Sequence, residues 1–100
     1  MKVLGIIPAR GGSKRVPRKN IKLLDGKPLI YYTINEAKKS TLIDRIIVDT
    51  DDNEIADTAL KYNIDVPYMR PSILAQDSTP DQPVFKHAVQ KLNKIDGFKP

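Results

Sequence analysis

A basic segment that contains two glycines follows the first apolar stretch of the chain. Between Arg10 and Lys19 it holds five Lys or Arg side chains and no acidic residue, with glycines at 11 and 12. Adjacent glycines let the backbone turn tightly and point successive N–H groups at an anion. Arginine can grip phosphate oxygens with two parallel hydrogen bonds, and lysine adds a mobile point charge. The segment therefore predicts a phosphate cradle; a solvated basic loop or a nucleic-acid surface is the alternative.

The positive charge of the chain is concentrated around this segment. The net charge is +5, from 17 Lys or Arg and 12 Asp or Glu. Residues 1–39 carry a net +8 and residues 40–100 a net −3. This distribution favours a local anion site over a uniformly cationic protein. Two common phosphate-binding motifs, G-x-G-x-x-G and G-x-x-x-x-G-K-[ST], do not occur in the sequence.

Three aspartates form a second candidate site. Asp49, Asp51 and Asp52 end an apolar stretch, where carboxylates suit Mg²⁺. They can instead cap a following helix, and Asp51 and Glu54 have the spacing of a capping box. Capping explains the spacing without an ion, so we favour it and assign no metal ligand within the chain.

Three short apolar stretches are typical of strands, at residues 3–7, 45–50 and 64–69. The first is continuous and suits a strand that is buried on both faces of a parallel sheet. The third contains Pro67, which has no N–H to donate, so we place it at a sheet edge.

Helical spacing of apolar residues predicts three helices. The first begins near Pro28 and ends near Ser40, the second is capped by Asp51 or Asp52, and the third ends at Gly97. The expected inward residues are Leu29, Ile30, Ile34 and Ala37 of the first, Ile55, Ala56, Ala59 and Leu60 of the second, and Val84, Phe85, Ala88, Val89, Leu92 and Ile95 of the third.

The alternation of strands and helices predicts an α/β fold with a parallel, doubly wound sheet. Ligands of such sheets bind beyond the carboxyl ends of the strands, where the basic segment lies. Residue 100 comes where a further strand is expected. We therefore expect residues 1–100 to be the N-terminal part of a single larger domain, incomplete at its C-terminal end.

Composition excludes several classes of site. Without cysteine there is no disulfide, thiolate metal site or cysteine nucleophile, and a cytoplasmic location is expected. The apolar runs fall far short of the roughly 18 residues that cross a bilayer. His87 lacks a partner at a useful spacing and receives no role. Tyr31 and Tyr32 are expected to be packing residues.

Several segments of the sequence resemble one known family. Residues 7–20, 26–30, 44–52, 55–56 and 70–77 are similar, in order and spacing, to the acylneuraminate cytidylyltransferases, or CMP-sialic acid synthetases. The resemblance implies a Rossmann-like fold of the nucleotide-diphospho-sugar transferase type. It also implies transfer of CMP from CTP to an acidic nine-carbon sugar, with Mg²⁺ and release of pyrophosphate.

The resemblance further implies roles for individual residues. Arg10, Lys14 and Lys19 would be catalytic residues. Arg10 and Lys19 would hold the triphosphate, and Lys14 would assist the leaving side. Arg70 would contact the nucleotide near the cytosine and ribose. The other implied nucleotide-binding residues are Ala9, Gly11, Gly12, Ser13, Asn20 and Asp77. Ser78, Thr79 or Asp81 can alternatively cap the helix that follows. The Mg²⁺ ligands are expected outside residues 1–100, and the full-length protein is expected to be a homodimer.

Alternatives remain for the substrate and for the class of function. Sialic, legionaminic and pseudaminic acids are all candidate acceptors, and a cytidylyltransferase for the eight-carbon sugar KDO is the nearest enzyme alternative. A basic module that binds nucleic acid through residues 10–22 is the alternative from another class. That segment lacks the aromatic residues on which bases would stack, so a nucleic-acid partner is not expected. The short apolar runs likewise lead us to expect no membrane partner. The 100-residue chain is expected to be inactive by itself.

Overall fold

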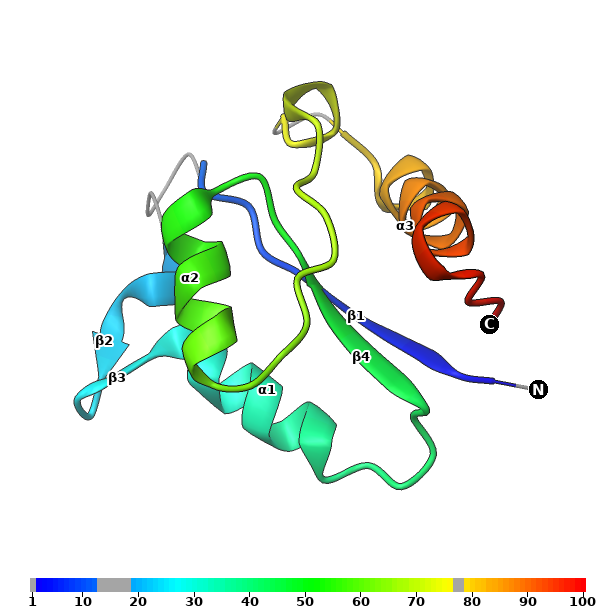
Figure 1. Ribbon diagram of the computed structural model, residues 1–100. Coiled ribbons are helices and arrows are strands. Elements are labelled where there is room, and N and C mark those ends of the chain that lie inside the picture. The colour runs from blue at the N-terminus through cyan, green and yellow to red at the C-terminus, as the bar shows by residue number, and fades with distance from the viewer. Residues whose placement is uncertain (1, 13–18, 77–78) are drawn as a thin grey trace.

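The computed structural model describes residues 2–12, 19–76 and 79–100 (Figure 1). Its centre is a pair of strands, β1 (Leu4–Pro8) and β4 (Arg45–Asp49). The α-helices of the described part are α1 (Leu29–Lys38), α2 (Asn53–Lys61) and α3 (Asp81–Asp96). The shorter elements are η1 (Lys19–Ile21), β2 (Leu23–Leu24), β3 (Lys27–Pro28) and η2 (Ser72–Leu74). None of the described helices is long and apolar enough to span a membrane.

The central strands are parallel, with Leu4 opposite Arg45 and Pro8 opposite Asp49. The prediction of a strand over residues 64–69 is wrong. Among the described residues, this segment makes one bridge to β4, between Asp65 and Ile47. Pro67 has no N–H to extend the ladder. The edge position is as predicted, because β4 lies between β1 and the bridging residue.

Helices cover both faces of this narrow sheet (Figure 1). Neighbouring residues of β4 point to opposite faces, as strand geometry requires. Val48 belongs to the core beneath α1 and α2, with Ile30, Ile34, Ile55 and Ala59. Ile47 belongs to the core beneath α3, with Tyr68, Ala88 and Leu92. The predicted α/β, doubly wound arrangement is confirmed.

The expected inward residues are only partly correct. Those at the centre of each stripe are buried, namely Ile30, Ile34, Ile55, Ala56, Ala59, Val84, Ala88 and Leu92. Leu29, Leu60, Phe85, Val89 and Ile95 are more than a third exposed, so their expected burial is wrong. The apolar stripes are wider than the narrow surface that β1, β4 and the edge segment offer. On α3, Phe85 and Val89 border an open apolar hollow together with Leu4 and Ile6 of β1.

A small hairpin precedes α1 and was not expected. Leu23 pairs with Pro28 and Leu24 with Lys27 in an antiparallel ladder. The turn residues Asp25 (φ 52°) and Gly26 (φ 79°) both have positive φ, as a two-residue hairpin turn requires. The adjacent Asp25 and Gly26 were the sequence signal that could have predicted this hairpin turn. Pro28 ends the hairpin and directly precedes α1, as the predicted helix start implied.

The helix ends follow local chemistry. The Asp52 carboxylate caps α2 by accepting from the N–H groups of Glu54 (2.9 Å) and Ile55 (3.1 Å). The expected capping box of Asp51 and Glu54 is wrong, because Asp51 bonds elsewhere. Gly97, at φ 73°, closes α3 as predicted. Pro80 precedes α3, and neither Thr79 nor Asp81 forms a side-chain cap there.

Replacing the α2 cap tests this assignment. Asp52→Ala removes the acceptor for two N–H groups, and we expect it to lower the free energy of unfolding by about 1 kcal/mol. Asp57→Ala is the matched control, because Asp57 is exposed on the same helix and caps nothing. It should change stability by less than about 0.5 kcal/mol. Urea denaturation measures both, and equal losses would contradict the cap.

Candidate functional site

A pocket of about 320 Å³ opens beyond the carboxyl end of β1. It is lined by Pro8, Arg10, Gly12, Lys19, Asn20, Arg70, Leu74, Thr79, Asp81 and Val84. Five of the predicted site residues therefore meet there, from the loop after β1, from η1 and from the segment that follows the edge bridge. Ser13, Lys14 and Asp77 lie outside the described residues. Pocket volumes of roughly 300–1,000 Å³ are usual for small-molecule ligands.

The basic side of the pocket is built by Arg10 and Lys19. Arg10 is partly buried, and its Nη1 donates to the carbonyl of Ala75 at 3.3 Å. Its own carbonyl accepts from Asn20 Nδ2 at 3.5 Å, which links the loop after β1 to η1. Lys19 is exposed at the start of η1, so its ammonium group can follow a ligand. This side of the pocket suits a polyanion.

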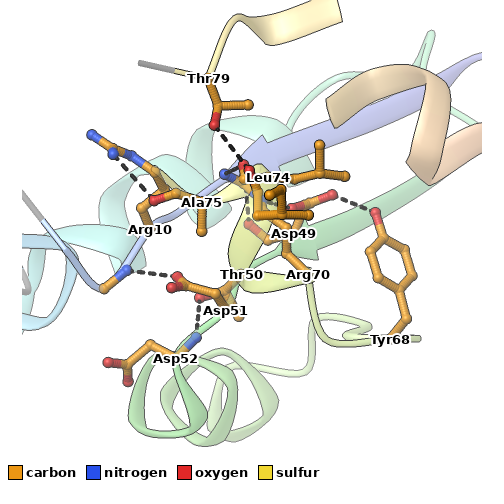
Figure 2. A network of polar contacts seen from close by, with 12 residues as sticks. Arg10, Asp49, Thr50, Asp51, Asp52, Tyr68, Arg70, Leu74, Ala75 and Thr79 are labelled. Atoms are coloured by element: carbon orange, nitrogen blue, oxygen red, sulfur yellow. Dashed lines mark hydrogen bonds and ion pairs between the residues drawn. The ribbon is translucent and has the colours of Figure 1, made fainter. Parts of the chain in front are cut away.

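Arg70 also lines the pocket and is buried, with 6% of the residue exposed. Its Nε donates to the Asp49 carboxylate, its Nη2 to the Asp49 carbonyl (3.2 Å) and its Nη1 to the Leu74 carbonyl (3.4 Å) (Figure 2). Tyr68 Oη donates to the second carboxylate oxygen of Asp49. Arg70 is therefore a buried, hydrogen-bonded side chain and not a surface arginine.

Asp49, Asp51 and Asp52 each make a different interaction (Figure 2). Asp49 pairs with Arg70, Asp51 accepts from the Gly11 N–H at 2.9 Å, and Asp52 caps α2. The expectation of capping is thus right for Asp52 and wrong for Asp49 and Asp51. Among the described residues, no group of three His, Cys, Asp or Glu side chains could hold a metal ion.

Gly11 and Ala9 do not line the pocket, but they tie the end of β1 and its loop to the end of β4. The Gly11 N–H points at Asp51, and Gly11 is absent from the pocket lining. A Cβ at Gly11 would lie 2.8 Å from the Cβ of Asp52, so the loop packs this close only with glycine. Ala9 is 1% exposed, and its N–H donates to the Asp49 carbonyl at 2.9 Å, which extends the strand pairing.

Several pocket residues were not foreseen. Leu74 and Val84 give the pocket an apolar wall, and Asp81 adds a carboxylate at its edge. Asp49 was considered only for capping or metal binding. The sequence signal for the Asp49–Arg70 pair was the position of Arg70 after the edge segment. Asp49 ends β4 and Arg70 follows the neighbouring parallel segment, so the two residues lie at the same end of the sheet.

The remaining candidates lie away from the pocket. The rings of Tyr31 and Tyr32 contact each other, and Tyr31 also packs on Tyr62. His87 packs edge-on against Tyr68, with ring centroids 5.3 Å apart, and lines no part of the pocket.

The chain matches known proteins over nearly its whole length. The family described as Cytidylyltransferase matches residues 4–95. A pseudaminic acid cytidylyltransferase of Campylobacter jejuni is 47% identical over 92% of the chain and 40% of its own length. A CMP-N,N'-diacetyllegionaminic acid synthase of Legionella pneumophila is 49% identical over 79% of the chain and 34% of its own length. An N-acylneuraminate cytidylyltransferase of Escherichia coli is 37% identical over 97% of the chain and 23% of its own length.

The chain therefore spans about 40% or less of the length of these relatives. A solved structure of a CMP:2-keto-3-deoxy-manno-octonic acid synthetase complexed with CTP superposes with a TM-score of 0.77. That match covers 96% of this chain and 36% of the other, at 24% identity. The expected fold type is thereby confirmed.

The close approach at Gly11 leads to a prediction. Gly11→Ala would place a Cβ within 3.0 Å of three Asp52 atoms, including the inflexible Cβ. We expect it to lower the free energy of unfolding by about 1–3 kcal/mol, the usual cost of overpacking. Gly12→Ala is the control, since its added Cβ meets no atom of the described residues within 4 Å. Urea denaturation that shows equal stability for both variants would contradict the packing.

Proposed function

The chain belongs to the cytidylyltransferase family, as its resemblance to the acylneuraminate cytidylyltransferases predicted, and we propose that it supplies the CTP-binding part of an enzyme that activates an acidic nine-carbon sugar. The observation that carries the proposal is the convergence of Arg10, Lys19 and Arg70 on one pocket at the carboxyl ends of parallel strands. Relatives named for pseudaminic, legionaminic and acylneuraminic acids support an acceptor of the nonulosonic class.

The proposed reaction is a nucleotidyl transfer. The anomeric hydroxyl oxygen of the sugar attacks the α-phosphorus of CTP, a new phosphorus–oxygen bond forms, and the bond to the β-phosphate oxygen breaks. The hydroxyl proton passes to water, and pyrophosphate leaves in line with the electron pair of the broken bond. A protein accelerates such a step by positioning the groups and neutralising charge. Arg10 and Lys19 carry the positive charge for the triphosphate, and Leu74 and Val84 shield one side of the pocket from water.

Mg²⁺ is part of the proposal, but the described residues do not fit it. The carboxylate of Asp49 is occupied by Arg70 and Tyr68, Asp51 by the Gly11 N–H, and Asp52 by the start of α2. On the family resemblance, we propose that the ligands of the ion lie outside residues 1–100. A homodimeric full-length protein and a cytoplasmic location complete the proposal.

Two alternatives are less well supported. The match to the enzyme for the eight-carbon sugar, at 24% identity, speaks for the fold, whereas the relatives at 37–49% identity carry nonulosonic-acid names. A nucleic-acid-binding module would need stacking platforms, and residues 10–22 contain no aromatic side chain.

Titration of the chain with CTP tests the proposal. We expect the wild type to bind CTP, and Lys19→Gln to weaken this binding by about tenfold, or about 1.4 kcal/mol, because it removes a cation from the pocket. Lys22→Gln is the matched control. It makes the same change in charge three residues away, at an exposed side chain that does not line the pocket. Isothermal titration calorimetry at fixed ionic strength measures all three.

The proposal fails if CTP produces no binding while single-stranded DNA binds strongly. The placement of the triphosphate fails if Lys22→Gln weakens CTP binding as much as Lys19→Gln, since general charge would then explain the effect.

A further inference from the structure

A chain of buried polar side chains holds Arg70, which lines the pocket (Figure 2). It consists of Tyr68, Asp49 and Arg70, which are 7%, 0% and 6% exposed. Nothing in the proposed reaction requires a carboxylate there. Burying a charged pair incurs a desolvation penalty of several kcal/mol per ion, which a surface arginine would avoid. The position of this pair therefore calls for a functional explanation.

Asp49 fixes the guanidinium of Arg70 from two directions. One carboxylate oxygen accepts from Arg70 Nε, and the backbone carbonyl accepts from Nη2 at 3.2 Å. The backbone of Arg70 is tied to the same strand end, because its N–H donates to the Thr50 carbonyl at 2.7 Å. The guanidinium plane is thus held by the end of β4.

Tyr68 holds the carboxylate in turn. Its hydroxyl donates to the oxygen of Asp49 that Arg70 Nε does not use. Burial, with the hydrogen bond to Asp49, raises the pKa of Tyr68 far above its ordinary value. The hydroxyl therefore stays protonated and remains a donor over the physiological pH range. Asp49 has little freedom to rotate away from Arg70.

This arrangement leaves donors for a ligand but little net charge. The contacts of Arg70 with described residues use one N–H on each of its three nitrogens. A guanidinium has five N–H groups, so Nη1 and Nη2 each keep one, and Arg70 lines the pocket. The adjacent Asp49 carboxylate cancels its charge. Such a group favours carbonyl or hydroxyl acceptors over phosphate.

We propose that Asp49 is a positioning residue, which orients Arg70 to bind the uncharged acceptors of the nucleoside and leaves the phosphates to Arg10 and Lys19. The inference rests on the proposed function, since it assumes that a cytidine nucleotide occupies the pocket. It assigns Asp49 and Tyr68 a part in selectivity although neither lines the pocket.

Comparison of CTP with inorganic tripolyphosphate tests the inference. The ratio of their dissociation constants measures what the nucleoside contributes, and loss of folded protein alone does not change it. In Asp49→Asn the amide cannot serve both Arg70 and Tyr68 as the carboxylate does. We expect the nucleoside contribution to fall by about tenfold, the size of one lost charge-assisted hydrogen bond. Tyr68→Phe, a milder change, should lower it by about threefold.

Asp96→Asn is the matched control. It also removes one carboxylate from an arginine, but from Arg45 in a largely exposed ion pair away from the pocket. The ratio of the dissociation constants of CTP and tripolyphosphate for Asp96→Asn should equal that of the wild type. If Asp49→Asn does not fold, Tyr68→Phe decides. If the wild type binds CTP much more tightly than tripolyphosphate and the folded variants keep this preference, only the proposed role of Asp49 is overturned. A wild type that binds CTP no better than tripolyphosphate would overturn the proposed function as well.

Discussion

Parallel pairing of β1 with β4 is the constraint on which the site depends. The register sets Pro8 opposite Asp49, so the loop after one strand meets the loop after the other. The Gly11 N–H then reaches Asp51, and the Ala9 N–H reaches the Asp49 carbonyl. An antiparallel pair would send these loops to opposite ends of the sheet. The pocket is therefore a direct consequence of strand direction.

The second constraint is the buried Asp49–Arg70 pair. Apolar residues of similar size in place of such a pair often leave stability unchanged or improve it, whereas removal of one partner typically costs about 3–5 kcal/mol. The pair is thus a poor way to gain stability, and its value lies in what it orients. The pocket thus combines Arg10 and Lys19, whose charge suits phosphate, with Arg70, whose charge is neutralised by Asp49.

Sequence reasoning succeeded where the signal was local or periodic. Spacing and backbone chemistry predicted the strands β1 and β4, the buried centres of the α2 and α3 stripes, the end of α3 at Gly97 and the grouping of basic residues at a strand end. The expected burial of the first strand on both faces is wrong, because only Ile7 of β1 is buried. It failed where packing between distant segments decided the outcome. The burial of Leu60 and Phe85 depends on the width of the sheet, and the Asp49–Arg70 pair joins residues 21 positions apart. Ser13, Lys14 and Asp77 remain predictions.

The central claim is that CTP binds at the carboxyl ends of the paired strands. Amide chemical-shift mapping by nuclear magnetic resonance, during titration of the ¹⁵N-labelled chain with CTP, tests it most directly. We expect the largest changes at the pocket residues Gly12, Asn20 and Arg70, and little change at Leu42 and Phe98, which lie near the amino end of β4. Changes centred on Leu42 and Phe98, with Gly12 and Arg70 unaffected, would contradict it.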